Sequence, residues 1–349
     1  MISPLRFSEP ITKISNVNLG KPVTLEIKKG VRICSILLDV TVTVSATGAA
    51  TQSIPLPSSG IGEIRLNING DTNRRRTAAQ LFGAQGLNAL NDKGNAGTVQ
   101  YFQAGAVITD TYGGITVGTV PVLIGSLEDV VLKAKLATNT ATIAVFNLPL
   151  IFAEDFRKEF DVAEAMALCT AFDNGNTVGP VVVEMDIPAA TGVAGTMTAV
   201  AVSADLEYDR MVARAGSQVM LSKEKVYNKQ YSGAGDIEVG DQLTNKERLM
   251  RVSLVTTADQ ISKVVVKQGS TVIKNVSFAA NQAQLRKCGY NGAALVANRF
   301  DIEFDVNDDP NSSLLLDPAH DLSIVATLAT WNDAVKNITI LPTYFGAIE

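Results

Sequence analysis

The sequence predicts an all-β protein in which strands form sandwiches and helices are few. Three observations lead to this prediction. Apolar residues recur at every second position through much of the chain, clusters of Gly, Asn, Thr and Ser separate these segments, and helical periodicity is confined to short stretches. A period of two places alternate side chains on opposite faces of a strand, so one face is buried and the other is polar. Many such strands joined by turn-rich segments are typical of a β-sandwich.

The alternating strands can be followed along the chain. From Cys34 to Val44 the even positions are apolar, and the positions between them are mostly polar. Residues 61–69 follow the same pattern and end at Asn69-Gly70, a hairpin-turn signal. Residues 300–306 and 322–328 alternate as well. Shorter strand signals occur at 23–27, 99–108, 130–136, 197–206, 249–255, 261–267 and 338–341.

Two segments are apolar at successive positions rather than at alternate ones. They are residues 143–152, which read IAVFNLPLIF, and the run that opens at 181–183. A strand of this kind is typically covered on both faces, or is packed against a neighbouring subunit.

Helical patterns are expected in three places. Residues 75–91 carry leucines on a rough helical stripe, weakened by two glycines. Residues 161–172 open with Asp161 as a cap and Glu164 three positions later. The third candidate covers residues 279–288.

A repeat at long range predicts two copies of one sandwich. In the first half a strand meets a turn at Gly70 and then a helix from about Arg75. In the second half a strand meets a turn at Gly269, and a short apolar stretch leads into the helix from Ala279. A similar order of elements half a chain apart suggests duplicated units. Because strand patterning lapses at 209–218, we expect a first domain over residues 1–209 and a second over 210–349.

Composition excludes several classes of function. The chain has 349 residues, with 30 Lys plus Arg, 35 Asp plus Glu and a net charge of -5. It therefore has no overall positive charge that would attract the phosphates of a nucleic acid. With the single histidine, His320, one chain cannot build a two-histidine metal site. Cys34, Cys169 and Cys288 are widely spaced, so free thiols are expected. The sequence opens with no secretion signal and has no long apolar run, so synthesis in the cytoplasm is expected.

Two charged segments offer candidate sites. Asp305, Asn307 and Asp309 supply oxygen ligands at alternate positions, which suits a calcium ion. Pro310 stands where an EF-hand requires glycine, so the EF-hand interpretation fails and a looser calcium site or a plain acidic loop is left. Arg74-Arg75-Arg76 is the longest basic run; it suits either a contact with lipid phosphates or an acidic neighbour, or a solvated helix start. No catalytic residue set and no phosphate-binding motif is found.

Two windows of this sequence resemble a known family. GEIRLNINGDTNRRRTAAQL, at residues 62–81, resembles part of the first jelly roll in coat proteins of corticovirus-type phages. FDIEFDVNDDPNSSLLLDPAHDLSIVATLATWNDAVKNITIL, at residues 300–341, resembles the end of their second jelly roll. These are double jelly-roll major capsid proteins of tailless icosahedral bacteriophages, usually with an internal membrane.

The resemblance implies two tandem eight-stranded jelly rolls and a structural, non-enzymatic role. It implies a homotrimer with a pseudo-hexagonal outline that tiles an icosahedral virion, with penton or spike proteins and the internal viral membrane as further partners. Its chain start would lie near that membrane, and direct nucleic-acid binding is not expected. The alternative is a calcium-dependent glycan-binding adhesin, because lectins also use jelly rolls. An aromatic content of 6% is low for sugar stacking.

Overall fold

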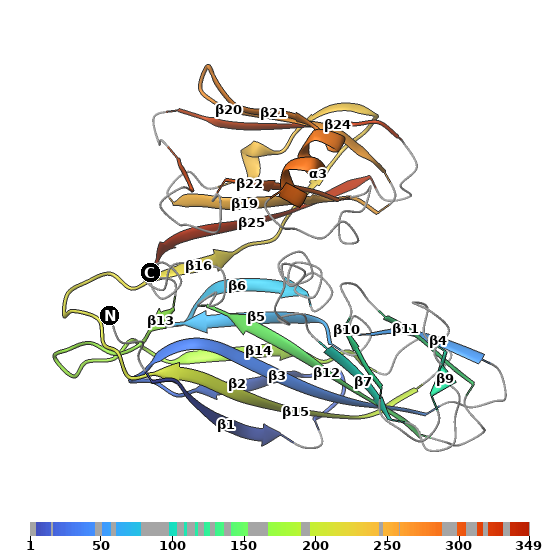
Figure 1. Ribbon diagram of the computed structural model, residues 1–349, viewed down its shortest axis with the longest axis vertical. Helices are drawn as coiled ribbons and strands as arrows, with labels where there is room; N and C mark the ends of the chain where they lie inside the picture. The colour runs from blue at the N-terminus through green and yellow to red at the C-terminus, as the bar shows by residue number, and fades with distance from the viewer. Residues whose placement is uncertain are drawn as a thin grey trace. The chain divides into compact units, whose positions relative to one another are not determined.

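A computed structural model describes most of the chain. The described residues are 5–14, 17–45, 51–56, 61–77, 98–102, 108–109, 116–117, 122–125, 130–135, 141–152, 167–189, 196–243, 247–257, 259–287, 299–304, 313–316, 320–330 and 336–348. They fall into two compact units, unit 1 up to Val219 and unit 2 from Met220 to Ile348. Within them, almost every regular element is a strand (Figure 1).

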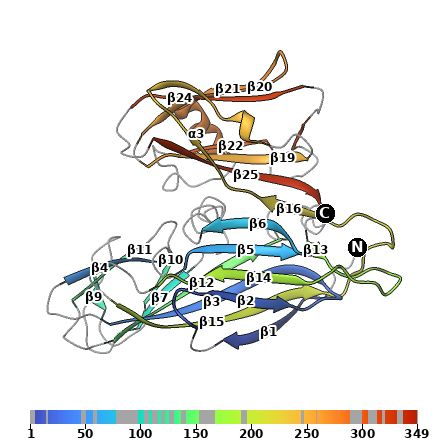
Figure 2. The same ribbon diagram turned by 180° about the vertical axis from the view of Figure 1, so that it is seen from behind.

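Unit 1 is a sandwich of two antiparallel sheets. One sheet has the order β1-β15-β3-β12 and the other the order β2-β14-β5-β6. β15 lies between β1 and β3 in both views (Figures 1 and 2). The chain crosses repeatedly from one sheet to the other, which is the jelly-roll topology. The strands are β1 (Phe7–Ile14), β2 (Pro22–Ile27), β3 (Arg32–Ser45), β5 (Glu63–Ile68), β6 (Asp71–Thr77), β12 (Ala141–Ile151), β14 (Val181–Asp186) and β15 (Thr196–Asp209).

Shorter strands add to this sandwich. β7 and β10 extend the first sheet beyond β12, β13 pairs with β3, and a separate sheet has the order β4-β11-β8-β9. Their bounds are β4 (Thr51–Leu56), β7 (Thr98–Phe102), β8 (Ile108–Thr109), β9 (Thr116–Val117), β10 (Val122–Gly125), β11 (Val130–Lys135) and β13 (Leu168–Cys169).

Unit 2 repeats the same plan. One sheet has the order β16-β25-β19-β22, with β17 and β23 at its side, and the other has the order β18-β24-β20-β21. Strand for strand this matches β1-β15-β3-β12 and β2-β14-β5-β6, so the chain contains two tandem jelly rolls. The bounds are β16 (Met220–Glu224), β17 (Tyr227–Gln230), β18 (Gly235–Glu238), the 3-10 turn η1 (Gly240–Gln242), β19 (Arg248–Val255), β20 (Ile261–Gln268), β21 (Thr271–Ser277), α3 (Phe278–Lys287), β22 (Arg299–Glu303), β23 (Leu314–Leu315), β24 (Leu322–Leu328) and β25 (Asn337–Ala347).

The alternating patterns set which faces are buried. In β3 the side chains of Cys34, Ile36, Leu38 and Val40 are at most 1% exposed, whereas those between them are partly exposed. β14 alternates as well, with its odd positions buried between the sheets. Its apolar residue Val182 is only half-buried, because this position lies on the outer face.

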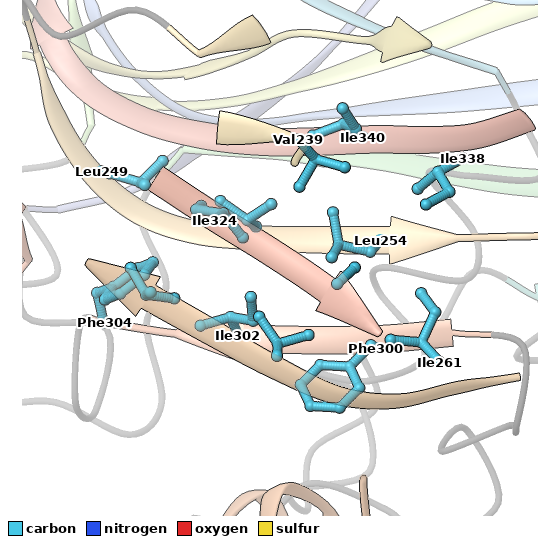
Figure 3. Packing of buried hydrophobic residues seen from close by; sticks show 14 of the residues in the cluster. Val239, Leu249, Leu254, Ile261, Phe300, Ile302, Phe304, Ile324, Ile338 and Ile340 are labelled. Carbon is cyan, nitrogen blue, oxygen red and sulfur yellow. The ribbon is translucent and has the colours of Figure 1, made fainter. Parts of the chain in front are cut away.

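The core of unit 2 is one continuous apolar layer. Side chains from both sheets, such as those of Leu254 and Ile324, occupy it together (Figure 3). Phe300 and Tyr344 are fully buried there. Burial of apolar surface on this scale is the main force that holds two sheets face to face.

The structure corrects two of the expected helices. Residues 75–77 belong to β6, because Asn69 and Gly70 have φ values of 57° and 94° and form a tight hairpin turn that sends the chain straight back beside β5. Residues 168–169 form strand β13, so the helix expected over 161–172 is also wrong there. Residues 78–91 and 161–166 lie outside the described part. The third helix is confirmed as α3.

The division between the units differs from the expected boundary at residue 209. Residues 210–219 remain with unit 1. The reason is local bonding: the amide of Ala213 donates to the carbonyl of Ala171 at 2.8 Å, and the amide of Asp173 donates to the carbonyl of Ala213 at 2.8 Å.

Candidate functional site

The expected calcium ligands Asp305, Asn307 and Asp309 lie outside the described residues. Across the described ranges, no group of three or more His, Cys, Asp and Glu side chains is arranged to hold a metal. His320 is exposed and sits against the β20–β21 turn, where a Cβ at Gly269 would approach its Cδ2 to 2.8 Å. The calcium site therefore stays a prediction.

The three consecutive arginines alternate across strand β6 instead of starting a helix. Arg74 and Arg76 are only 6% and 5% exposed, whereas Arg75 points to the outer face. The guanidinium of Arg74 lies 4.4 Å from the centre of the Phe152 ring, a cation–π contact. Two of the three charges are thus used inside unit 1 and do not form a polybasic surface.

A charged cluster covers the centre of the outer face of the β2-β14-β5-β6 sheet. We call Glu63, Arg65, Arg75, Glu184 and Asp186 the Arg65 cluster. Arg65 donates to Asp186 at 2.8 and 3.1 Å, to Glu63 at 2.9 Å and to Glu184 at 3.2 Å. Arg75 donates to the second Glu63 oxygen at 2.7 Å. The Asp186 carboxylate, followed by those of Glu63 and Glu184, raises the pKa of Arg65.

The cluster assembles from neighbouring strands, because their registers align. Arg65 lies directly opposite Glu184 of β14 and Arg75 of β6. Opposite charges across a strand pair stabilise a sheet modestly. Sequence reasoning missed the cluster, since the cluster requires β6 to be a strand and both β6 and β14 to be sheet neighbours of β5.

A buried ion pair closes one end of the first sheet of unit 1. Arg32, at the start of β3, donates from Nε and Nη2 to Asp209 at the end of β15, with a shortest distance of 2.6 Å. Asp209 is fully buried and also accepts the amide of Met211 at 2.9 Å. Such a fork is worth little net stability, but removing one partner leaves a buried charge uncompensated.

The thiol of Cys34 lies beside this pair. Burial raises its pKa to about 11, so the thiol stays protonated at neutral pH and is a poor nucleophile. Cys34 and Cys169 are free thiols. Cys288 lies outside the described residues.

Unit 2 uses an apolar contact at the corresponding place. Where β19 begins alongside β25, Leu249 faces Tyr344, and both are fully buried. A buried ion pair lies next to this contact, because Lys223, directly opposite Tyr344 on β16, donates to Glu247 at 2.5 Å. Arg299 and Ser253 both donate to the Asp301 carboxylate, which is 4% exposed. These polar groups form hydrogen bonds with one another, so we interpret them as structural supports of the sheet.

Comparisons with known structures identify the fold. The major capsid protein P2 of bacteriophage PM2 superposes with a TM-score of 0.64 at 17% identity, covering 99% of this chain and 98% of that chain. The STIV (Sulfolobus turreted icosahedral virus) major capsid protein gives a TM-score of 0.65 at 14% identity, with 98% and 97% covered. A PBCV-1 capsid protein gives 0.58 at 10% identity, with 99% and 94% covered.

The chain has the double jelly-roll fold. The neighbours extend over nearly its whole length, so both units match and not one alone. No protein-family model matches the sequence, and no curated protein sequence matches it. The fold class expected from the sequence is confirmed. The described part contains no helix with the length and apolar character needed to cross a membrane.

Proposed function

We propose that this chain is a structural subunit of an icosahedral viral shell, a major capsid protein with no enzymatic role. The observation that carries the proposal is the repeated strand order of the two units within one chain. Its support is that viral capsid proteins of the same two-unit fold match this chain from end to end. A pair of similar sandwiches in one chain is suited to repeated edge-to-edge packing.

In this proposal three copies assemble into a homotrimer, in which six jelly rolls give a near-hexagonal tile. The trimers then form the virion shell together with penton or spike proteins. Synthesis takes place in the host cytoplasm, and an internal viral membrane separates the shell from the genome. The mild negative charge of the chain suits a coat that does not bind nucleic acid.

Native mass spectrometry of the purified protein at about micromolar concentration tests the proposal. We expect trimers with no smaller stable oligomer, because obligate interfaces bury large apolar areas. A plain monomer at this concentration would contradict it.

The calcium-dependent adhesin is the weaker alternative. The fold neighbours named above are capsid proteins, and an aromatic content of 6% is low for sugar stacking. Calcium at Asp305, Asn307 and Asp309 is kept as a separate proposal, because a cation could stabilise a shell as well as bind a glycan. A glycan array with and without calcium separates the two, since only the adhesin binds sugars when calcium is present.

A further inference from the structure

A tyrosine and a β-bulge occupy the same place in the first sheet of each unit. Tyr208 of β15 lies opposite Ile33 of β3, and Tyr344 of β25 lies opposite Leu249 of β19. Directly after this pair, the register of the sheet shifts by one residue in both units. Because a bulge is a specific local feature of a strand pair, the two tyrosines allow the units to be aligned residue by residue.

The alignment extends to the first strands of the units, β1 and β16. Phe7 and Lys223 lie opposite the two aligned tyrosines, so these residues correspond. Glu9 lies two residues further along β1 and therefore corresponds to Lys225. The amide of Lys225 donates to the carbonyl of Pro342 at 3.2 Å, so the pairing with β25 continues at this position. The first strand of unit 1 thus carries a carboxylate where that of unit 2 carries an ammonium group.

An ion pair ties the first strand of unit 1 to the connection between β2 and β3. Lys28 in this connection donates to Glu9 at 2.8 Å and to the Tyr208 hydroxyl at 3.2 Å, and that hydroxyl donates to Glu9 at 2.9 Å. The hydrogen bond between Lys28 and Glu9, followed by those to the tyrosine, lowers the pKa of Glu9 and raises the pKa of Lys28. The first strand supplies the negative partner of this pair.

Unit 2 ties its first strand to the corresponding connection, between β18 and β19, with the opposite polarity. Lys223 of β16 donates to Glu247 at 2.5 Å, and Lys229 of β17 binds Asp241 at 2.5 Å. β17 continues the first strand, since it pairs with the next part of β25. The side chains of Lys223 and Glu247 are only 5% and 14% exposed. In both pairs the first strand supplies the positive partner.

We propose that this reversed polarity directs each first strand to its own unit while the chain folds. Two copies of one topology can exchange equivalent strands, within a chain or between copies. With β16 in the place of β1, Lys225 would face Lys28, which is a contact of like charges. With β1 in the place of β16, Phe7 would replace Lys223 and leave Glu247 without this cation in a mostly buried position.

The shared features of the two units do not make this choice. Both first strands pair antiparallel with a strand that carries the same tyrosine beside the same bulge. Discrimination between such similar sites requires a repulsive contact at the wrong one. The Glu9–Lys28 pair, with side chains 36% and 44% exposed, adds little net stability, so its larger effect is on this discrimination. The inference concerns the folding of the chain and is independent of the proposed function.

Disulfide trapping during oxidative refolding of the full chain tests this inference. Glu224→Cys with Glu207→Cys reports exchange, because Glu224 corresponds to Ser8, which lies opposite Glu207 in the native sheet. Ser8→Cys with Glu207→Cys reports the native placement and is the matched control. Peptide mass spectrometry identifies each disulfide and separates it from any formed by the natural cysteines.

Charge changes are then added to the exchange reporter. Glu9→Lys with Lys28→Glu keeps the pair of unit 1 but reverses it, so a misplaced Lys225 meets a carboxylate, and we expect the exchange disulfide to rise by about tenfold or more. Lys225→Glu alone should raise it as well, because it would face Lys28. All three substitutions together restore like charges, and the exchange disulfide should return to the level of the unmodified charges.

This combination separates charge sorting from a general loss of stability. If the changes merely weakened the fold, the three together would give at least as much exchange as either set alone, and that result would overturn the inference. Absence of the exchange disulfide from every variant would also overturn it, since another feature then places the strands. The native-placement reporter, carrying the same charge changes, shows whether unit 1 still folds. Neither result bears on the capsid proposal, which is tested by the oligomeric state of the unmodified protein.

Discussion

At the centre of one outer sheet face, unit 1 has an arginine ringed by carboxylates, whereas the corresponding position in unit 2 is a valine. Arg65 lies opposite Glu184 and Arg75. In the matching strands of unit 2, Val265 lies opposite Val325 and Asn275. The buried faces differ as well. The Arg32–Asp209 ion pair joins β3 to β15 in unit 1, whereas Leu249 lies opposite Tyr344 between the matching strands β19 and β25 of unit 2.

This difference shows that the topology of each unit and the contacts its surface can make depend on different features of the sequence. The strand order is the same in both units, so it depends on the alternating apolar pattern and the tight turns, which both units share. The side chains at matching positions have diverged, so the two units offer unlike surfaces. A tile made of both units would therefore meet its neighbours through contacts that are not interchangeable.

The largest expected effect is on the buried ion pair of unit 1. Asp209→Ala should lower the free energy of unfolding by about 3–5 kcal/mol, because Arg32 is then left buried without its carboxylate. Chemical denaturation followed by circular dichroism measures the loss. Arg32→Leu combined with Asp209→Leu should lose much less, as the Leu249–Tyr344 contact of unit 2 suggests. A mild effect of Asp209→Ala alone would contradict the importance of the pair.

A smaller effect is expected at the two equivalent hairpin turns. Gly70→Ala should cost about 1–2 kcal/mol, because its φ of 94° is unfavourable for a side chain even though nothing lies within 4 Å of the new Cβ. Gly269→Ala, at φ 57°, adds a contact with His320. Thermal unfolding should show that His320→Ala recovers part of the loss at Gly269 and none at Gly70. Equal recovery at both turns would contradict this assignment.

The smallest effect is expected when an exposed ion pair of unit 2 is removed. Lys229 binds Asp241 at 2.5 Å and lowers the pKa of that carboxyl below 3.8. The pair therefore contributes stability above about pH 4, and the contribution is lost as pH falls through the lowered pKa. Asp241→Asn should cost about 0.2–1 kcal/mol at neutral pH and nothing in stronger acid. Denaturation at a series of pH values checks this, and a difference that grows in acid would have the wrong sign.

Most of the fold followed from local patterns. The strands containing Cys34–Val40 and Ile64–Ile68 were predictable because alternation over a long segment has one structural solution. The helix expected from Arg75 was wrong because a leucine stripe beyond it outweighed the Asn-Gly turn, which commits the next residues to a returning strand. The Arg65 cluster could not be predicted, since it joins residues from three strands.

The most direct test of the central claim is electron microscopy of the purified oligomer in negative stain. The account predicts class averages with three-fold symmetry and a near-hexagonal outline, in which two unlike lobes alternate around the ring. Averages of a single two-lobed particle, or of a dimer with two-fold symmetry, would contradict it.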